Sequence, residues 1–121
     1  KVEYAGAFHP LYHVHNGVVD TIRADRFSIG FSETWESVYF TNHVIDVEKG
    51  DMLYMCTDGY ADQFGGGDDC KFKTRRIKEM LLRICNLPVE KQKEEVYNRI
   101  MNWMDGCPQV DDILFIGTRV N

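Results

Sequence analysis

Hydrophobic positions in the first half of the chain alternate with polar ones or form short runs, a pattern typical of β-strands. We expect strands over residues 2–7, 11–15, 18–24 and 36–47. Residues 52–57 form a nearly continuous apolar run, which predicts a central strand buried on both faces. A further apolar run predicts a final strand over residues 113–120.

Turn-forming residues separate these strands. Asn16-Gly17 suits a two-residue type I′ turn, because both positions of that turn need a positive φ, so residues 11–24 should form a hairpin. We expect a turn over residues 48–51, and irregular chain over 27–34 with a bend at Gly30. Residues 58–69 are rich in glycine, and we therefore expect a loop there.

The second half of the chain changes to a helical period. A first helix is expected over residues 74–85, because Ile77, Met80, Leu81 and Ile84 recur at the spacing of one helix face. A second helix should begin at Pro88 and end before Gly106. Its apolar face would consist of Val96, Ile100, Trp103 and Met104. Mainly antiparallel strands with a helical pair indicate an α+β fold in which helices cover a sheet.

Size and composition restrict the classes of function. The chain has 121 residues, enough for one domain at most. Its net charge of −5 disfavours nucleic acid as a partner, and no apolar run is long enough to cross a membrane. We expect no membrane contact by this chain. Four cysteines without a C-x-x-C pair favour a reduced cytoplasmic protein over a zinc knuckle. Because the chain begins without Met inside an expected strand, we expect residues 1–121 to be a partial domain cut from a longer polypeptide.

Two strand ends carry carboxylates that could bind a metal ion. Asp58 follows the buried run 52–57, and Gly59 after it would let the backbone turn sharply and a ligand approach. Asp111 and Asp112 open the last strand, where neighbouring side chains point to opposite faces, so at most one of them would share a site with Asp58. Hard cations such as Mg²⁺ and Mn²⁺ prefer such oxygen ligands. The alternatives are an ordinary Asp-Gly turn and a merely solvated strand end.

Other chemistry is less well supported. His13 and His15 would face the same side of a strand and could bind iron or zinc, as in cupin-like barrels, but no second histidine–carboxylate cluster follows them in the sequence. Residues 65–67 are glycines without the Lys-Ser ending of a phosphate-binding P-loop. We therefore favour sheet histidines and a loop beside the carboxylate site.

The order of several motifs resembles the C-terminal half of SpoIIE-type phosphatases, members of the metal-dependent type-2C protein phosphatase superfamily. The matching motifs are Ala5-Gly6 followed by Pro10-Leu11, Ile29-Gly30, Gly50-Asp51, Thr57-Asp58-Gly59 and Asp111-Asp112-Ile113. They cover essentially the whole chain in the family's order. The stretches 58–66 and 109–112 are most similar to members carried on bacterial sensor proteins.

The resemblance implies a sandwich of two mostly antiparallel sheets flanked by helices, which hydrolyses phosphoserine or phosphothreonine in a signalling protein. It implies a two-metal site of Mn²⁺ or Mg²⁺ that activates water, with Asp58 and Asp111 as ligands and Gly59 and Asp112 in supporting roles. Phe8 and His9 depart from the family pattern. The motifs of the family's N-terminal half, which supply further ligands, are absent.

We therefore expect activity in the parent protein and little or none in this chain alone. The resemblance implies a phosphoprotein partner such as an anti-sigma-factor antagonist, in the cytoplasm or in the cytoplasmic part of a membrane-anchored sensor. A truncated sandwich could also pair with itself as a homodimer. The alternative function is a degenerate phosphatase fold that only docks a partner protein.

Overall fold

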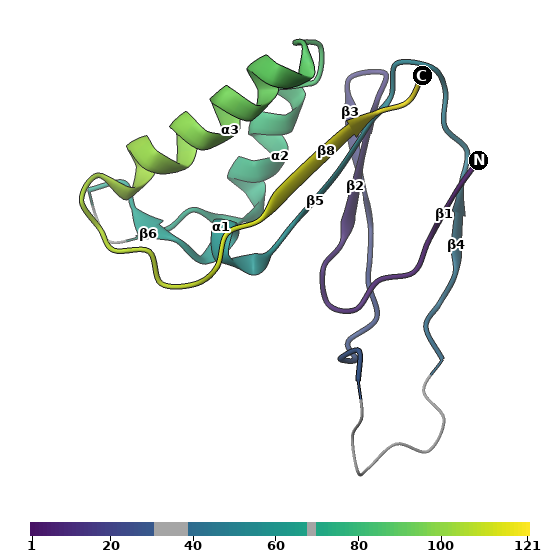
Figure 1. Cartoon of the computed structure of the whole chain (residues 1–121), viewed down its shortest axis with the longest axis horizontal. Coiled ribbons are helices and arrows are strands. Elements are labelled where there is room, and N and C mark those ends of the chain that lie inside the picture. The colour runs from purple at the N-terminus through teal and green to yellow at the C-terminus, as the bar shows by residue number, and fades with distance from the viewer. Residues whose placement is uncertain (31–38, 68–69) are drawn as a thin grey trace.

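A four-stranded antiparallel sheet lies between a helical layer and a two-stranded ribbon (Figure 1). This computed structural model describes residues 1–30, 39–67 and 70–121. The sheet has the order β3-β2-β5-β8, formed by Val18–Ile22, Leu11–His15, Met52–Cys56 and Phe115–Arg119. The ribbon pairs β1 (Val2–Tyr4) with β4 (His43–Ile45). The helices are α1 (Asp58–Asp62), α2 (Lys73–Ile84) and α3 (Val89–Met104), and a short ribbon joins β6 (Phe64–Gly65) to β7 (Cys70–Lys71). The α+β class predicted from the sequence is confirmed.

The main hydrophobic core fills the space between the sheet and the helices. Alternate residues of β2 and β5 face this layer, among them Tyr12, Val14 and Tyr54. The predicted apolar face of α2 is buried against them, and Ile77 and Leu81 have no exposed surface. In α3 the buried apolar residue of the predicted face is Ile100, with Val96, Trp103 and Met104 packed at the edge of the core. The helical period of the sequence therefore identified the correct faces.

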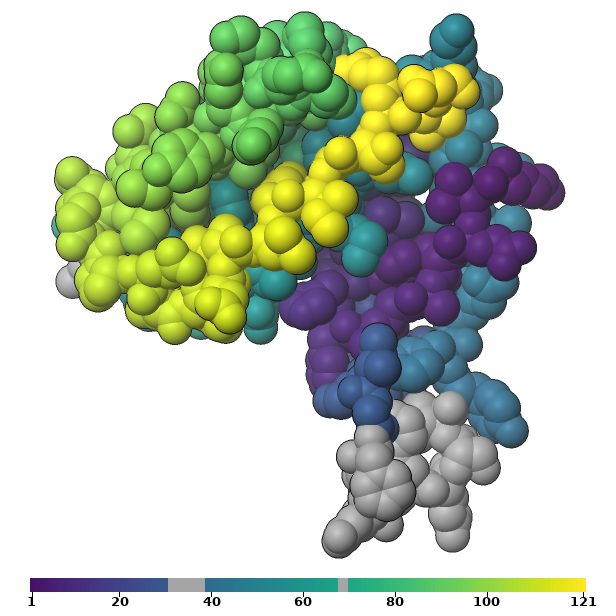
Figure 2. Space-filling view, viewed as in Figure 1, coloured from purple at the N-terminus to yellow at the C-terminus, as the bar shows by residue number. Residues whose placement is uncertain are grey.

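A smaller core lies on the opposite face of the same sheet. Tyr4 of β1 packs there with Leu11 and Leu53, which β2 and β5 direct away from the helices. The prediction that residues 52–57 are buried on both faces holds for most of the strand, but Met55 is exposed. Figure 2 shows β8, in yellow, running across the surface of this view, and Leu114 and Ile116 are more than half exposed. The sheet thus has an apolar strip that neither core covers.

The hairpin predicted around Asn16-Gly17 is present. Both turn residues have positive φ values of 46° and 75°, as a type I′ turn requires. The strand register follows from this two-residue turn, with His15 paired to Val18 and His13 paired to Asp20. The hairpin therefore fixes which side chains of β2 and β3 lie next to each other.

Two sequence predictions need correction. Residues 58–69 were expected to form a loop, but they contain α1 and β6; residues 68 and 69 lie outside the described part. Tyr60 explains the ordered turn, because its side chain is fully buried and its hydroxyl donates to the carbonyl oxygen of Val96 at 2.8 Å. Within the described part of the strand expected over 36–47, only His43–Ile45 is paired, and residues 36–38 are not described.

A buried polar contact joins the sheet to α3 and gives a stability prediction. The Tyr54 hydroxyl donates to Oε1 of Gln92 at 2.6 Å, and Nε2 of Gln92 donates to the carbonyl oxygen of Leu87 at 2.8 Å. Tyr54→Phe should lower the free energy of unfolding by about 1–2 kcal/mol, because it leaves a buried amide oxygen without its donor. Urea unfolding measures the change. The matched control is Tyr97→Phe, because Tyr97 is 61% exposed and its loss of a hydroxyl should change stability by less than about 0.5 kcal/mol.

Candidate metal centre at the end of the central strand

Asp58 lies where the central strand β5 ends and the short helix α1 begins. Antiparallel pairing of β5 with β8 sets Cys56 opposite Phe115, so the end of β5 meets the segment that leads into β8. That segment contains Asp111 and Asp112, and all three carboxylates belong to exposed residues. The segments that carry the two motifs singled out in the sequence thus come together at one end of the sheet.

Thr57 fastens these two segments to each other. Its Oγ1 donates to the carbonyl oxygen of Asp112 at 2.8 Å and accepts the N–H of Leu114 at 3.0 Å. Its backbone N–H also donates to the carbonyl oxygen of Leu114 at 3.0 Å. The residue before Asp58 therefore uses both backbone and side chain to hold the segment that follows Asp111.

Gly59 has a structural role that differs from the one inferred from the sequence. It does not have the positive φ of a glycine-dependent turn. Instead, a Cβ at this position would lie 2.3 Å from the carbonyl oxygen of Asp112, closer than atoms can pack. Glycine is needed here because the backbone of α1 lies directly against the backbone of residue 112.

Asp111 and Asp112 differ in what their groups contact. The backbone N–H of Asp112 donates to Oδ1 of Asp111 at 2.7 Å, which orients the Asp111 carboxylate. Asp112 contributes mainly through its backbone, since its carbonyl oxygen is the acceptor for Thr57. Asp58 and Asp111 belong to exposed residues at the end of the sheet where β5 stops. Their carboxylate oxygens are ligands that fit Mg²⁺ or Mn²⁺.

These two carboxylates form only part of a ligand set. Within the described ranges, the cluster of three side chains close enough to share a metal ion consists of His13, His15 and Asp20, and not of residues around Asp58. A site at Asp58 and Asp111 therefore needs ligands beyond those that this part of the chain places there. The expectation that the remaining ligands lie in another part of the parent protein stays a prediction.

The cysteine nearest to Asp58 is not a competing nucleophile. Cys56 is buried in the main core. Burial, together with the negative charge of Asp58, raises the pKa of the Cys56 thiol to about 11. The thiol stays protonated at neutral pH, so it is a poor nucleophile and a poor metal ligand.

Sequence reasoning missed two carboxylates that contact the histidine pair. Oδ2 of Asp20 lies 2.8 Å from Nε2 of His15, and Oδ2 of Asp51 lies 2.7 Å from Nε2 of His13. Asp20 could have been found, because a two-residue turn at positions 16 and 17 places residue 20 opposite residue 13. Asp51 could not, because it depends on how β5 pairs with β2 across a long stretch of chain.

No described helix combines the length and the apolar character that crossing a membrane would require.

Comparisons with known proteins agree on a family and a fold. The family model described as stage II sporulation protein E (SpoIIE) matches residues 1–121. Among solved structures, the chain is similar to the SiaA-PP2C domain of Pseudomonas aeruginosa, with 28% sequence identity and a TM-score of 0.85. The match covers 98% of this chain but 46% of that one, so this chain spans less than half the length of its structural relative. No curated protein gives a significant match.

Proposed function

This chain belongs to the SpoIIE family, and on that premise we propose that its parent protein is a metal-dependent phosphatase that hydrolyses phosphoserine or phosphothreonine in a signalling protein. The observation that supports the proposal is that Thr57, next to Asp58, is hydrogen-bonded to residues 112 and 114, which follow Asp111, at the end of the central strand. The similarity to a PP2C domain over nearly the whole chain supports a phosphatase in general.

In this proposal, Asp58 and Asp111 would hold Mn²⁺ or Mg²⁺ through their carboxylate oxygens. Bound metal ions of this kind lower the pKa of a water molecule and orient it for in-line attack on phosphorus. Thr57 and the backbone of Asp112 keep the two ligands in place, and Gly59 allows the two backbones to approach. The chain by itself should release little or no phosphate, because two carboxylates do not complete a two-metal site.

The substrate would be a phosphoprotein, and an anti-sigma-factor antagonist is the kind that the family resemblance suggests. The exposed position of Asp58 and Asp111 supports a substrate of this size, because a phosphorylated side chain on a protein surface can reach them. The parent protein would act in the cytoplasm as part of a signalling pathway.

Release of inorganic phosphate from phosphopeptides tests the proposal. The complete protein with Mn²⁺ should hydrolyse phosphoserine and phosphothreonine peptides, and chelation by EDTA should abolish the activity until Mn²⁺ is restored. A phosphotyrosine peptide of the same sequence serves as the matched substrate control. The isolated 121-residue chain, assayed in parallel, should show no more than background release.

Two outcomes would contradict the proposal. Hydrolysis that persists in EDTA would exclude the metal-dependent reaction. Binding of a phosphopeptide without any hydrolysis by the complete protein would favour a docking module that retains the fold without the chemistry.

A further inference from the structure

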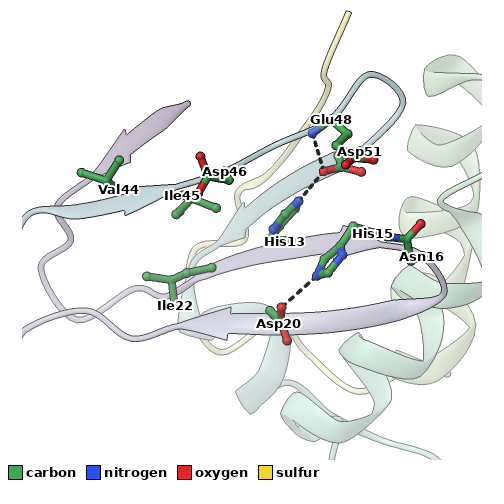
Figure 3. Close-up of a pocket in the computed structure, with 10 residues that line it drawn as sticks. All are labelled: His13, His15, Asn16, Asp20, Ile22, Val44, Ile45, Asp46, Glu48 and Asp51. Atoms are coloured by element: carbon green, nitrogen blue, oxygen red, sulfur yellow. Dashed lines mark hydrogen bonds and ion pairs between the residues drawn. The ribbon is translucent and has the colours of Figure 1, made fainter.

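A histidine–carboxylate cluster lies at the opposite end of the sheet from Asp58. His13 and His15 project from the same face of β2, and their rings stack with centroids 4.4 Å apart (Figure 3). Oδ2 of Asp20 on β3 lies 2.8 Å from Nε2 of His15. Each of the three residues offers one ligand atom, and these atoms all lie within 4.8 Å of one another. In a tetrahedral zinc site, neighbouring donors are roughly 3.4 Å apart, so a small inward rotation would bring them to bonding distance.

His13 is a buried polar residue, and its burial suggests a functional role. His13 is only 5% exposed, although its polar imidazole ring lies in a sheet of mainly apolar residues. Nε2 of His13 pairs with Oδ2 of Asp51 at 2.7 Å, and the backbone N–H of Glu48 donates to the same carboxylate oxygen at 2.9 Å. These contacts orient both the carboxylate and the ring. A carboxylate that fixes the ring of a ligating histidine is the usual outer contact of metal sites in proteins.

The contact with Asp51 decides which ring nitrogen of His13 is available. Oδ2 of Asp51 accepts the backbone N–H of Glu48 and lies 2.7 Å from Nε2 of His13, so it is placed to accept a hydrogen bond from that ring nitrogen. A neutral His13 must then carry its proton on Nε2, which leaves the lone pair on Nδ1 free to bind a metal ion.

An open pocket gives an ion access to this cluster. The pocket has a volume of about 410 Å³, and its lining includes all three residues of the cluster. Asp46 and Glu48 add acidic groups to its lining, and Ile22 and Val44 form an apolar wall (Figure 3). Acidic groups beside a partly apolar site attract cations and strengthen their binding.

We propose that His13, His15 and Asp20 bind a divalent transition-metal ion, with Zn²⁺ as the best match. Two imidazole nitrogens and one carboxylate are ligands that Zn²⁺ accepts readily, with a fourth position open to water from the pocket, whereas Mg²⁺ prefers an all-oxygen set. The site is separate from the proposed phosphatase centre, because Asp51 lies just before β5 and Asp58 just past its end, roughly 20 Å apart along the strand. The inference does not depend on the proposed function.

Zinc titration of the complete protein tests this site. Isothermal titration calorimetry in excess Mg²⁺, which occupies an all-oxygen centre, should show one additional Zn²⁺ per chain. His15→Ala and Asp20→Asn should each weaken that binding by more than about 100-fold, because losing a ligand costs more than losing an outer contact. Asp51→Asn should weaken it by about 10- to 100-fold, the usual effect of an outer contact. Co²⁺ added in place of Zn²⁺ should give the visible absorption of a four-coordinate site, and His15→Ala should remove it.

Two control variants separate this site from the rest of the protein. His43→Ala removes a histidine outside the cluster and should leave zinc binding unchanged. Asp58→Asn alters the phosphatase centre and should also leave it unchanged. Zinc binding that survives both His15→Ala and Asp20→Asn, or that is lost only in Asp58→Asn, would overturn the proposal, as would the absence of zinc binding at micromolar concentrations. His15 and Asp20 lie at the surface of the hairpin, so their variants should stay folded, which circular dichroism checks.

Discussion

Asp58→Asn in the complete protein should lower kcat/KM for a phosphoserine peptide by about a thousandfold while leaving the fold intact. The substitution keeps the shape of the side chain but removes the negative charge that would bind the metal ion. A metal ion contributes several kcal/mol to stabilising such a transition state, and about 4 kcal/mol corresponds to a thousandfold change in rate. Asp58 is exposed, so loss of its charge should not destabilise the core.

Asp62→Asn is the matched control for this experiment. Asp62 is at the other end of the same helix, half-exposed and paired with Lys71 at 2.9 Å. Loss of this surface ion pair should change stability by less than about 1 kcal/mol and activity by less than about twofold. Equal losses of activity in the two variants, or full activity in Asp58→Asn, would remove Asp58 from the proposed centre.

Gly59→Ala should damage both stability and activity. The added Cβ would lie 2.3 Å from the carbonyl oxygen and 3.0 Å from the carbonyl carbon of Asp112, and these backbone atoms cannot rotate away. Relief requires α1 to separate from the segment that leads into β8, at a cost of about 3 kcal/mol for overpacking of this kind. That separation would also move Asp58 relative to Asp111, and a displacement of about 1 Å can reduce catalysis by about 100-fold.

Gly67→Ala is the control that separates the effect of the Gly59–Asp112 backbone contact from the general effect of replacing a glycine. Gly67 has a φ of 83° and open space around it, so alanine there introduces backbone strain without a clash. The expected loss is about 1 kcal/mol, with activity unchanged. Thermal unfolding and phosphopeptide assays of both variants measure the two effects. If Gly59→Ala lowers stability and activity no more than Gly67→Ala does, the close approach of the two backbones is not what holds Asp58 and Asp111 in position.

The elements predicted well from the sequence are those determined by local patterns. The face of α2 follows from the spacing of Ile77 and Leu81, and the hairpin follows from Asn16-Gly17, because neighbouring residues decide both. The helical turn at 58–62 was missed because its anchor, Tyr60, bonds to the distant carbonyl oxygen of Val96. Glycine content alone suggested a loop, but a tertiary contact orders the segment.

In the candidate site, too, local features could be predicted from the sequence and tertiary contacts could not. Strand ends and the family resemblance were enough to nominate Asp58 and Asp111, and the pairing of β5 with β8 brings their segments together. The role of Thr57 in holding the two segments together could not be predicted, because it depends on two hydrogen bonds with residues more than fifty positions away. The carboxylate partner of His13 was hidden for a similar reason, because Asp51 reaches it only through the pairing of two strands.

The two-residue turn at Asn16-Gly17 also makes the histidine cluster sensitive to insertions. One additional residue in this turn would shift the pairing of β2 and β3, so that Val19 or Thr21 would stand opposite His13 in place of Asp20. The same shift would turn Val19, which packs against the main core, toward the other face of the sheet. Homologues that keep both histidines and the short turn should therefore keep the cluster, while those with a turn one residue longer should have lost it.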